Sequence, residues 1–587
     1  MAKKDLWNTI SLTPLTGQLD TRSRPADIPP GGFRWKQNFA VTPEGKLCRQ
    51  SGFERFFSDA ASYTNYDFHS RGGTRKPLTF MFESTASDGT RRFFCGTQSA
   101  IYRLNQDTGE YDTLIDGVGA EGTRWHAAEL QNTVMFTNNN DPVYMCDVAG
   151  ATVSPVGSLL YNNNVSAAAV IVQYNGFMIV MNVVQAGVRQ GARIHWGDLN
   201  IPDGFNIAPA SSLAGFQDLE YGDDILNAAP LLGALYIFTR RSIWRMMPSG
   251  DSTSVFAFTK VYTEPKNQSG CLAFPNTLVS DGQDIRYMGR DGIYRYNPYI
   301  PAPVRDDWLH RADGLIYRQL PTQIDGDYCL SPVAEYMPTN REIWWSWPTI
   351  GTNGINNYAL VSQVELKTAG VVDHGFTALV NFRRTPASAQ KCNEVQDFLG
   401  VSGEDYCIKS IGGVFYREMV TLDSSGDPTV DIPEDSAYYT VGYNSILRGM
   451  VPLGMADREK KLRRLLIDHD TSEQDVPCVV QLRIGNSFVL VDPNDTDVIC
   501  APQWRVIKFD GVNGITNPPL QCADQMKLPD MAAAGLRPNK GMAWPMLETG
   551  RFLYYELTIL NADGSPAVGG DTCLQRIDFD AMAMTKP

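Results

Sequence analysis

One acidic loop holds the carboxylates that are best spaced for catalysis in this sequence. Asp218, Glu220, Asp223 and Asp224 lie within seven residues of one another. Two of them could stand about 5–10 Å apart, which is the separation that glycoside hydrolases use. Neither an Arg cluster nor a repeated Asp-box accompanies the loop. An ordinary solvated loop of an acidic protein is therefore favoured, and no residue is assigned a catalytic role.

The sequence predicts no metal site and no cofactor site. Its His residues are widely separated, and the HExxH, GxSxG and Walker A motifs are absent. Asp281, Asp284 and Asp291 flank the strand-like run Ile285–Gly289 and could converge on Ca²⁺. Calcium takes six to eight oxygen ligands, however, and no EF-hand or nonapeptide repeat supplies them. A role as turn residues is favoured. The six His are His69, His126, His195, His310, His374 and His469.

Three aromatic–Arg pairs could stack bases and neutralise phosphates of a single-stranded nucleic acid. They are Tyr102-Arg103, Trp244-Arg245 and Tyr294-Arg295. Neighbouring side chains on a strand point to opposite faces. The aromatic ring should therefore pack inside the protein while the Arg reaches solvent or a carboxylate.

The aromatic–Arg pairs belong to a sequence motif that the chain repeats. Arg91–Asn105, Leu235–Pro248 and Ile285–Pro298 each contain a β-rich run, a polar turn, and then a small residue, Ile, an aromatic residue and Arg. Such patterns predict β-hairpins. Weaker versions occur at Val134–Asp147, Phe177–Gly197, Ile343–Leu366 and Tyr406–Met419.

The seven hairpins recur at intervals that are mostly close to fifty residues, with one short and one long exception. A multi-stranded repeat of this length is typical of a β-propeller blade. We therefore expect an all-β fold with a propeller of six or seven blades; the alternative is a large β-protein whose hairpins merely resemble one another. The positions taken as equivalent are Ile101, Val143, Ile194, Ile243, Ile293, Leu360 and Val414.

Breaker residues and composition divide the chain into three predicted parts. Residues 1–60 form an N-terminal arm that enters the first blade or closes the ring, and residues 61–435 form the propeller. The acidic, Pro-containing segment Asp423–Asp435 marks a boundary, after which alternating strands in 436–587 predict a C-terminal β-sandwich. Pro301–Leu320 predicts a short inserted helix with Asp306 or Asp307 near its start.

The net charge, the cysteine pattern and the lengths of the apolar runs argue against several classes of protein. The 51 Lys and Arg against 65 Asp and Glu give a net charge of −14, which argues against a binder that neutralises phosphates. Eleven Cys without CxxC spacing predict reduced, mostly buried thiols formed in a cytoplasm. No signal-peptide core and no run of about 18 apolar residues is present, so no export signal and no membrane span are expected.

Three stretches resemble the tail-nozzle or tail-tubular β-propeller virion proteins of short-tailed bacteriophages. They are Gly31–Phe56, Arg193–Phe205 and Gly222–Met246, and the C-terminal runs REKKLRRLLID and GRFLYYELTI are similar to the strand pairs that close such chains. The residues that match the family's phrases are Arg49, Gly52, Trp196, Gly197, Asp198, Asp223, Asp224, Ile225, Ser242, Ile243 and Trp244.

The resemblance implies a structural, non-enzymatic tail protein that is made in the host cytoplasm and located in the virion. Proteins of that family assemble as a ring, commonly six-fold, that forms the distal DNA channel, closes it before ejection and supports fibres or a needle. The implied partners are further copies of the chain, neighbouring tail proteins such as an adaptor, and double-stranded DNA that passes without specific binding. The alternatives are a glycan-binding or glycan-cleaving propeller, and an intracellular scaffold propeller that binds peptides.

Overall fold

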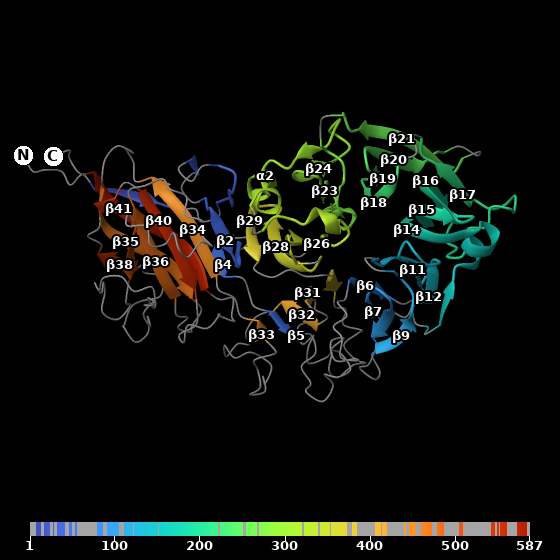
Figure 1. Cartoon of the computed structure of the whole chain (residues 1–587), viewed down its shortest axis with the longest axis horizontal. Helices are drawn as coiled ribbons and strands as arrows, with labels where there is room; N and C mark the ends of the chain where they lie inside the picture. The colour runs from blue at the N-terminus through green and yellow to red at the C-terminus, as the bar shows by residue number, and fades with distance from the viewer. Residues whose placement is uncertain are drawn as a thin grey trace, which may run out of the picture.

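The structure is a computed structural model of the chain. It describes most of residues 79–372. Outside this range it describes strands and short segments between residues 7 and 55 and between residues 378 and 583. Strand dominates the described residues, and the fold is all-β (Figure 1).

Six four-stranded antiparallel units form the blades of a propeller. Five of them are separate sheets, and the sixth is one end of a nine-stranded sheet. Within each blade the strands are hydrogen-bonded in chain order, so every blade is an up-and-down meander. In chain order the blades are β6(Phe80–Thr85), β7(Arg91–Gly96), β8(Ile101–Leu104) and β9(Tyr111–Ile115); β10(His126–Leu130), β11(Thr133–Thr137), β12(Tyr144–Asp147) and β13(Val153–Pro155); β14(Val165–Tyr174), β15(Phe177–Gln185), β16(Val188–Trp196) and β17(Gly215–Asp218); β18(Ile225–Leu231), β19(Ala234–Thr239), β20(Ser242–Pro248) and β21(Phe256–Thr263); β22(Val279–Ser280), β23(Ile285–Met288), β24(Ile293–Tyr296) and β25(Val304–Arg305); and β26(Val333–Met337), β27(Glu342–Pro348), β28(Asn356–Gln363) and β29(Thr368–Val372).

A further sheet stands between the sixth blade and the first. Its strand β30(Ala378–Arg383) contacts both β26 and β6, which are the innermost strands of those two blades (Figure 1). The sheet continues through β31(Asp405–Ile411) and β32(Val414–Glu418) to β5(Phe53–Arg55) and β33(Thr440–Val441). A strand from near the N-terminus therefore pairs with the sheet that completes the circle.

The repeated sequence motif corresponds to the second and third strands of each of the six blades and of the further sheet that contains β30. The seven predicted hairpins correspond to β7–β8, β11–β12, β15–β16, β19–β20, β23–β24, β27–β28 and β31–β32. The predicted equivalence of positions is confirmed, because six of the seven residues lie in a third strand and Val143 immediately precedes one.

The core clusters that the structure describes lie between neighbouring blades. One cluster joins Ile194 of the third blade to Ile237 and Trp244 of the fourth, and the first two residues are fully buried. The next cluster contains Tyr294, whereas the neighbouring Arg295 is one-third exposed and stands 3.6 Å from Asp284. The expectation that the aromatic residue packs between blades while the Arg reaches a carboxylate is confirmed here.

Two short helices fill the long interval before the sixth blade. They are α2(Leu309–Ala312) and α3(Gly314–Tyr317), as the sequence predicts for this stretch. The carbonyl of Asp306 accepts from His310 N at 2.8 Å, so this residue lies at the start of the helical turn. Leu309, Leu315 and Ile316 are buried in the core that also contains Trp345 and Trp347 of β27. Among the described residues, no helix has the length and apolar character required to cross a bilayer.

Strands from both ends of the chain share two sheets beside the sixth blade (Figure 1). The parallel pairing of β2(Trp35–Gln37) with β29 extends the sixth blade into β34(Ser445–Pro452), β40(Phe552–Ile559), β36(Cys478–Gly485) and β37(Trp504–Lys508). The second sheet contains β1(Trp7–Ser11), β3(Phe39–Val41), β4(Leu47–Arg49), β35(Lys460–Thr471), β38(Met542–Pro545), β39(Thr549–Gly550) and β41(Thr572–Ala583). The predicted boundaries at residues 60 and 435 stay predictions.

The expectation of reduced, mostly buried thiols fails at one cysteine among those that the structure describes. Cys48 is disulfide-bonded. Cys95, Cys146 and Cys271 are free and buried, and Cys329 is free and exposed.

Candidate functional site

The carboxylates of the acidic loop do not converge on one site. Asp218 lies on β17, the outermost strand of the third blade, and accepts from Arg193 Nε at 2.6 Å. That hydrogen bond holds the pKa of Asp218 below its usual value. A glycosidase acid needs a raised pKa, so Asp218 does not suit that role.

The other two aspartates of the loop lie at the entrance to β18, the innermost strand of the next blade. Asp223 Oδ2 accepts from Thr239 Oγ1 at 2.9 Å and from Arg241 N at 3.0 Å. Asp224 Oδ2 stands 3.1 Å from Arg240 Nε. The loop thus crosses from the outer edge of one blade to the inner edge of the next, and its acids hold turns in place.

The three aspartates considered as calcium ligands, with a role as turn residues favoured, form ion pairs with arginines. The guanidinium of Arg286 contacts Asp281, Asp284 and Asp306, and the Arg286 Nε to Asp306 Oδ2 distance is 2.9 Å. Burial alone would lower the pKa of Arg286, but the neighbouring carboxylates outweigh it and raise that pKa. Asp291 pairs with Arg305. Within the described part of the chain, no group of three His, Cys, Asp or Glu could hold a metal ion.

The histidines that the structure describes lie in three different places. Burial and the nearby Arg124 lower the pKa of His126 to about 4, and burial and Arg193 do the same for His195. Both imidazoles are therefore neutral near pH 7. His310 stands 3.5 Å from Asp313.

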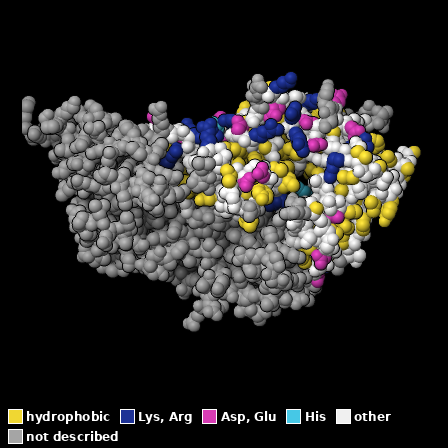
Figure 2. All heavy atoms as spheres, viewed as in Figure 1, with side chains coloured by type: hydrophobic (Ala, Val, Ile, Leu, Met, Phe, Trp, Pro, Cys, Tyr) yellow, Lys and Arg dark blue, Asp and Glu magenta, His cyan; other side chains and the backbone are white. Residues whose placement is uncertain are grey.

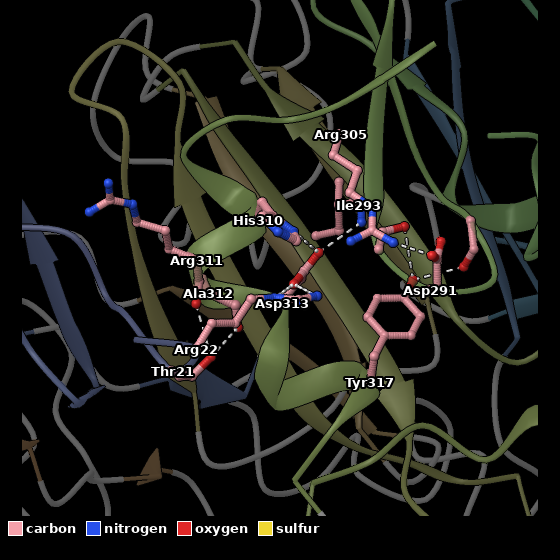
Figure 3. Close-up of polar contacts among 12 residues, drawn as sticks. Thr21, Arg22, Asp291, Ile293, Arg305, His310, Arg311, Ala312, Asp313 and Tyr317 are labelled. Atoms are coloured by element: carbon pink, nitrogen blue, oxygen red, sulfur yellow. Dashed lines mark hydrogen bonds and ion pairs between the residues drawn. The ribbon is translucent and has the colours of Figure 1, made fainter. Parts of the chain in front are cut away.

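A buried carboxylate at Asp313 joins the N-terminal segment to the inserted helices (Figure 3). Its Oδ1 accepts from Arg22 Nε at 2.7 Å, and its Oδ2 accepts from Ile293 N at 3.2 Å. Thr21 Oγ1 donates to Arg311 O at 2.9 Å. Desolvation raises the pKa of Asp313 although Arg22 acts to lower it. The insertion therefore anchors residues 21 and 22 of its own chain.

The third blade carries a lateral apolar surface formed mainly by the loop between β16 and β17. Figure 2 shows hydrophobic side chains gathered along this edge of the ring. Tyr161, in the preceding helical turn, is 80% exposed. The other members are between 43% and 49% exposed: Leu199, Ile201, Ile207, Leu213 and Phe216. Exposed apolar residues that are clustered, unlike scattered ones, mark interaction surfaces.

Internal hydrogen bonds hold the lateral apolar surface in a defined shape. Asp203 Oδ1 accepts from Ser158 N at 2.8 Å, and Phe205 O accepts from Asn163 Nδ2 at 2.6 Å. Trp196 Nε1 donates to Leu213 O at 2.9 Å. Phe205 itself is buried between the second and third blades. Binding would therefore require little ordering of the loop, which favours association.

Sequence reasoning did not identify this surface, although its signal is present. The loop reads NIPDGFNIAPASSLAG from residue 200 to 215 and carries three large aliphatic residues where loops are usually polar.

No family model and no curated protein matches the chain. Among solved structures, YCF48 bound to a D1 peptide is similar at 12% identity and a TM-score of 0.34, covering 60% of this chain and 95% of that one. An extracellular domain of a one-component system from B. thetaiotaomicron is similar at 11% identity and a TM-score of 0.39, covering 92% of this chain and 62% of that one.

Proposed function

We propose that this chain is a structural protein of a bacteriophage tail that assembles with further copies of itself into a nozzle-like ring. The observation that carries the proposal is the lateral apolar surface, whose shape is fixed within the subunit and whose exposed side chains include Tyr161 and Ile201. Two of the stretches that resemble the tail family can be located on the structure. Arg193–Phe205 contains the end of β16 and the beginning of the loop that bears the lateral apolar surface, and Gly222–Met246 contains β18, β19 and most of β20.

The positions of the two ends of the subunit favour a head-to-tail ring. The lateral apolar surface lies at one end of the long axis, and the sheets built from N- and C-terminal strands lie at the other (Figure 1). A contact between two different patches is heterologous, and it closes into a ring when the rotation per subunit allows. In this proposal, the N-terminal arm and a C-terminal β-sandwich supply the second patch and the contacts to an adaptor, fibre or needle.

In the proposed ring, DNA passes through the central channel that the subunits enclose together, and not along the axis of a single propeller. Arg124 precedes β10 in the second blade, and its guanidinium donates to Thr79 O at 3.3 Å and to Ser331 O at 3.0 Å. Thr79 lies just before the first strand of the first blade, and Ser331 lies just before the first strand of the sixth. The Arg124 side chain therefore crosses the axis of the propeller. A net charge of −14 suits a wall that repels a passing duplex.

A direct experiment locates the chain in particles of the phage that encodes it. Purified particles would be labelled with an antibody against the C-terminal region and imaged by electron microscopy, and quantitative mass spectrometry would give the copy number. The proposal expects label at the distal tail and about six copies per particle. Absence of the chain from purified particles, together with its recovery as a soluble host-cell protein, would overturn the proposal.

A further inference from the structure

The axial mouth of the propeller contains a cavity of about 420 Å³, separate from the lateral apolar surface. Its walls come from the second to fifth blades and from the loop before the sixth. Every lining loop either leads into a first strand or joins a second strand to a third. In an antiparallel meander those loops lie at the same end of the blades. The cavity falls within the range of about 300–1,000 Å³ that is typical of small-molecule sites.

Successive blades place a polar side chain at the corresponding point of the cavity wall. These residues lie at the end of the second strand or in the turn that follows, except Asn182, which lies at a bulge within β15. They are Asn138 and Asn139 of the second blade, Asn182 of the third, Arg240 of the fourth and Arg290 of the fifth. Polar residues are common in such turns, and here the turns of several blades bring them to one cavity.

The cavity is positively charged although the protein as a whole is acidic. Its ionic lining residues are Arg124, Arg240, Arg290 and Asp224, so three cations minus one anion leave a charge of +2. Arg124 keeps its charge near neutral pH, because burial lowers its pKa only to about 10. His126 is neutral at this pH, as described above.

Arg290 is the cation best placed to accept a ligand. Its side chain is exposed, and among the residues that the structure describes it forms no hydrogen bond and no ion pair. The ion pair between Arg240 and Asp224 is also open to solvent, since their side chains are 63% and 40% exposed. An Arg guanidinium matches the two oxygens of a carboxylate through paired N–H donors.

Much of the remaining wall is apolar, and Thr123 and Asn276 add two further polar side chains. Ile225 and Leu272 are buried and Ala169 and Ala273 lie beside them, so the cavity joins a cationic rim to an aliphatic floor. A ligand that fits both parts carries an anionic oxygen group at one end and a small apolar body at the other. Inorganic ions satisfy only the first requirement.

We propose that the axial cavity binds an organic carboxylate, with Arg290 and Arg240 contacting the carboxylate oxygens and the apolar body resting on Ile225 and Leu272. The carboxylate belongs either to a free small molecule or to the end of a peptide chain. Both sources present the same chemistry to the two arginines.

The test is isothermal titration calorimetry of the full chain with four probes. Benzoate and its neutral counterpart benzamide separate charge from shape, an N-acetylated dipeptide with a free terminal carboxylate represents a peptide source, and inorganic phosphate represents a bare anion. We expect saturable binding of benzoate, of the dipeptide or of both, and at least tenfold weaker binding of benzamide. Binding of the dipeptide alone would identify a peptide source, and binding of benzoate alone a small-molecule source.

Two variants test whether the carboxylate binds at the axial cavity. Arg290→Gln removes no described contact, so it should fold normally and weaken carboxylate binding at least tenfold. Arg241→Gln alters the next residue of the same turn as Arg240, outside the cavity lining, and should bind like the wild type. Equal affinity for benzoate and benzamide, binding of phosphate alone, retention of binding in Arg290→Gln, or no saturable heat up to about 10 mM of any carboxylate probe would each overturn the proposal. Oligomeric state is not part of this readout, so its outcome is independent of the proposed tail function.

Discussion

Replacement of Lys36 by Met should stabilise the protein, because Lys36 is a buried cation. Its side chain is 1% exposed, on β2 beside β29 and β34. Its Nζ donates to Thr368 Oγ1 at 2.6 Å. Burial lowers the pKa of Lys36 from 10.5 to about 7, although the charge of Glu342 acts to raise it. The folded protein therefore holds this proton less tightly than the unfolded chain does.

The sign of the pH dependence follows from this difference. Since the pKa of Lys36 is lower in the folded state, the free energy of unfolding rises with pH between about 7 and 10.5. Below pH 7 the protein bears the full destabilisation that comes from burying the charged lysine. At about 1.4 kcal/mol per pKa unit, the full penalty is roughly 5 kcal/mol, of which roughly 2 kcal/mol is relieved between pH 7 and pH 9.

Lys36→Met removes the charge and keeps most of the side-chain volume. Glu342 loses a nearby cation but still accepts from Trp344 Nε1 at 3.1 Å. We therefore expect a net gain of about 1–4 kcal/mol at pH 7. That gain should shrink by about 2 kcal/mol at pH 9, where the wild-type lysine is largely neutral.

Denaturant unfolding followed by Trp fluorescence at pH 7 and pH 9 provides the assay. Lys266→Met is the matched control, because Lys266 is exposed in the loop after β21 and its loss should change little. A lower midpoint for Lys36→Met than for the wild type at pH 7, or an equal advantage at both pH values, would refute the reasoning.

Three further predictions concern other parts of the chain. Arg22→Gln leaves the buried Asp313 without its cation and should cost about 3–5 kcal/mol. Faster proteolytic cleavage near residue 22 would show this, and unchanged cleavage would contradict it. Arg286→Met removes the cation that Asp281, Asp284 and Asp306 share, although Asp284 keeps Arg295 at 3.6 Å, so the variant should melt well below the wild type at pH 8 and regain stability as the pH falls toward 4; a pH-independent loss would argue against carboxylate repulsion. Tyr161→Ser with Ile201→Asp changes exposed side chains, so the subunit should keep its native circular dichroism spectrum while the apparent mass in light scattering falls.

The repeating part of the fold could be predicted because its signal is local. A hairpin needs only two β-rich runs and a turn, so Leu235–Pro248 identifies β19 and β20 without knowledge of the rest of the chain. The interval after Ile293 is long because it contains α2 and α3, and the sequence also indicates this insertion.

The non-local pairings could not be predicted in the same way. Gln37 of β2 pairs with Val371 of β29, more than three hundred residues later, and no local pattern specifies that partner. The ion pairs share this limitation. Asp281 and Asp284 precede Arg286 closely in sequence, but Asp306 reaches it only because β24 and β25 fold back. The axial cavity likewise depends on turns from several blades meeting at one point.

The mass of the purified protein in solution tests the central claim most directly. Light scattering after size exclusion, at several concentrations and with a neighbouring tail protein added, distinguishes a single subunit of 65.1 kDa from a closed ring. The proposed tail function predicts a discrete mass several times that of the subunit, lost when Tyr161 and Ile201 are substituted as above. A wild-type mass fixed at one subunit under every condition would contradict the ring.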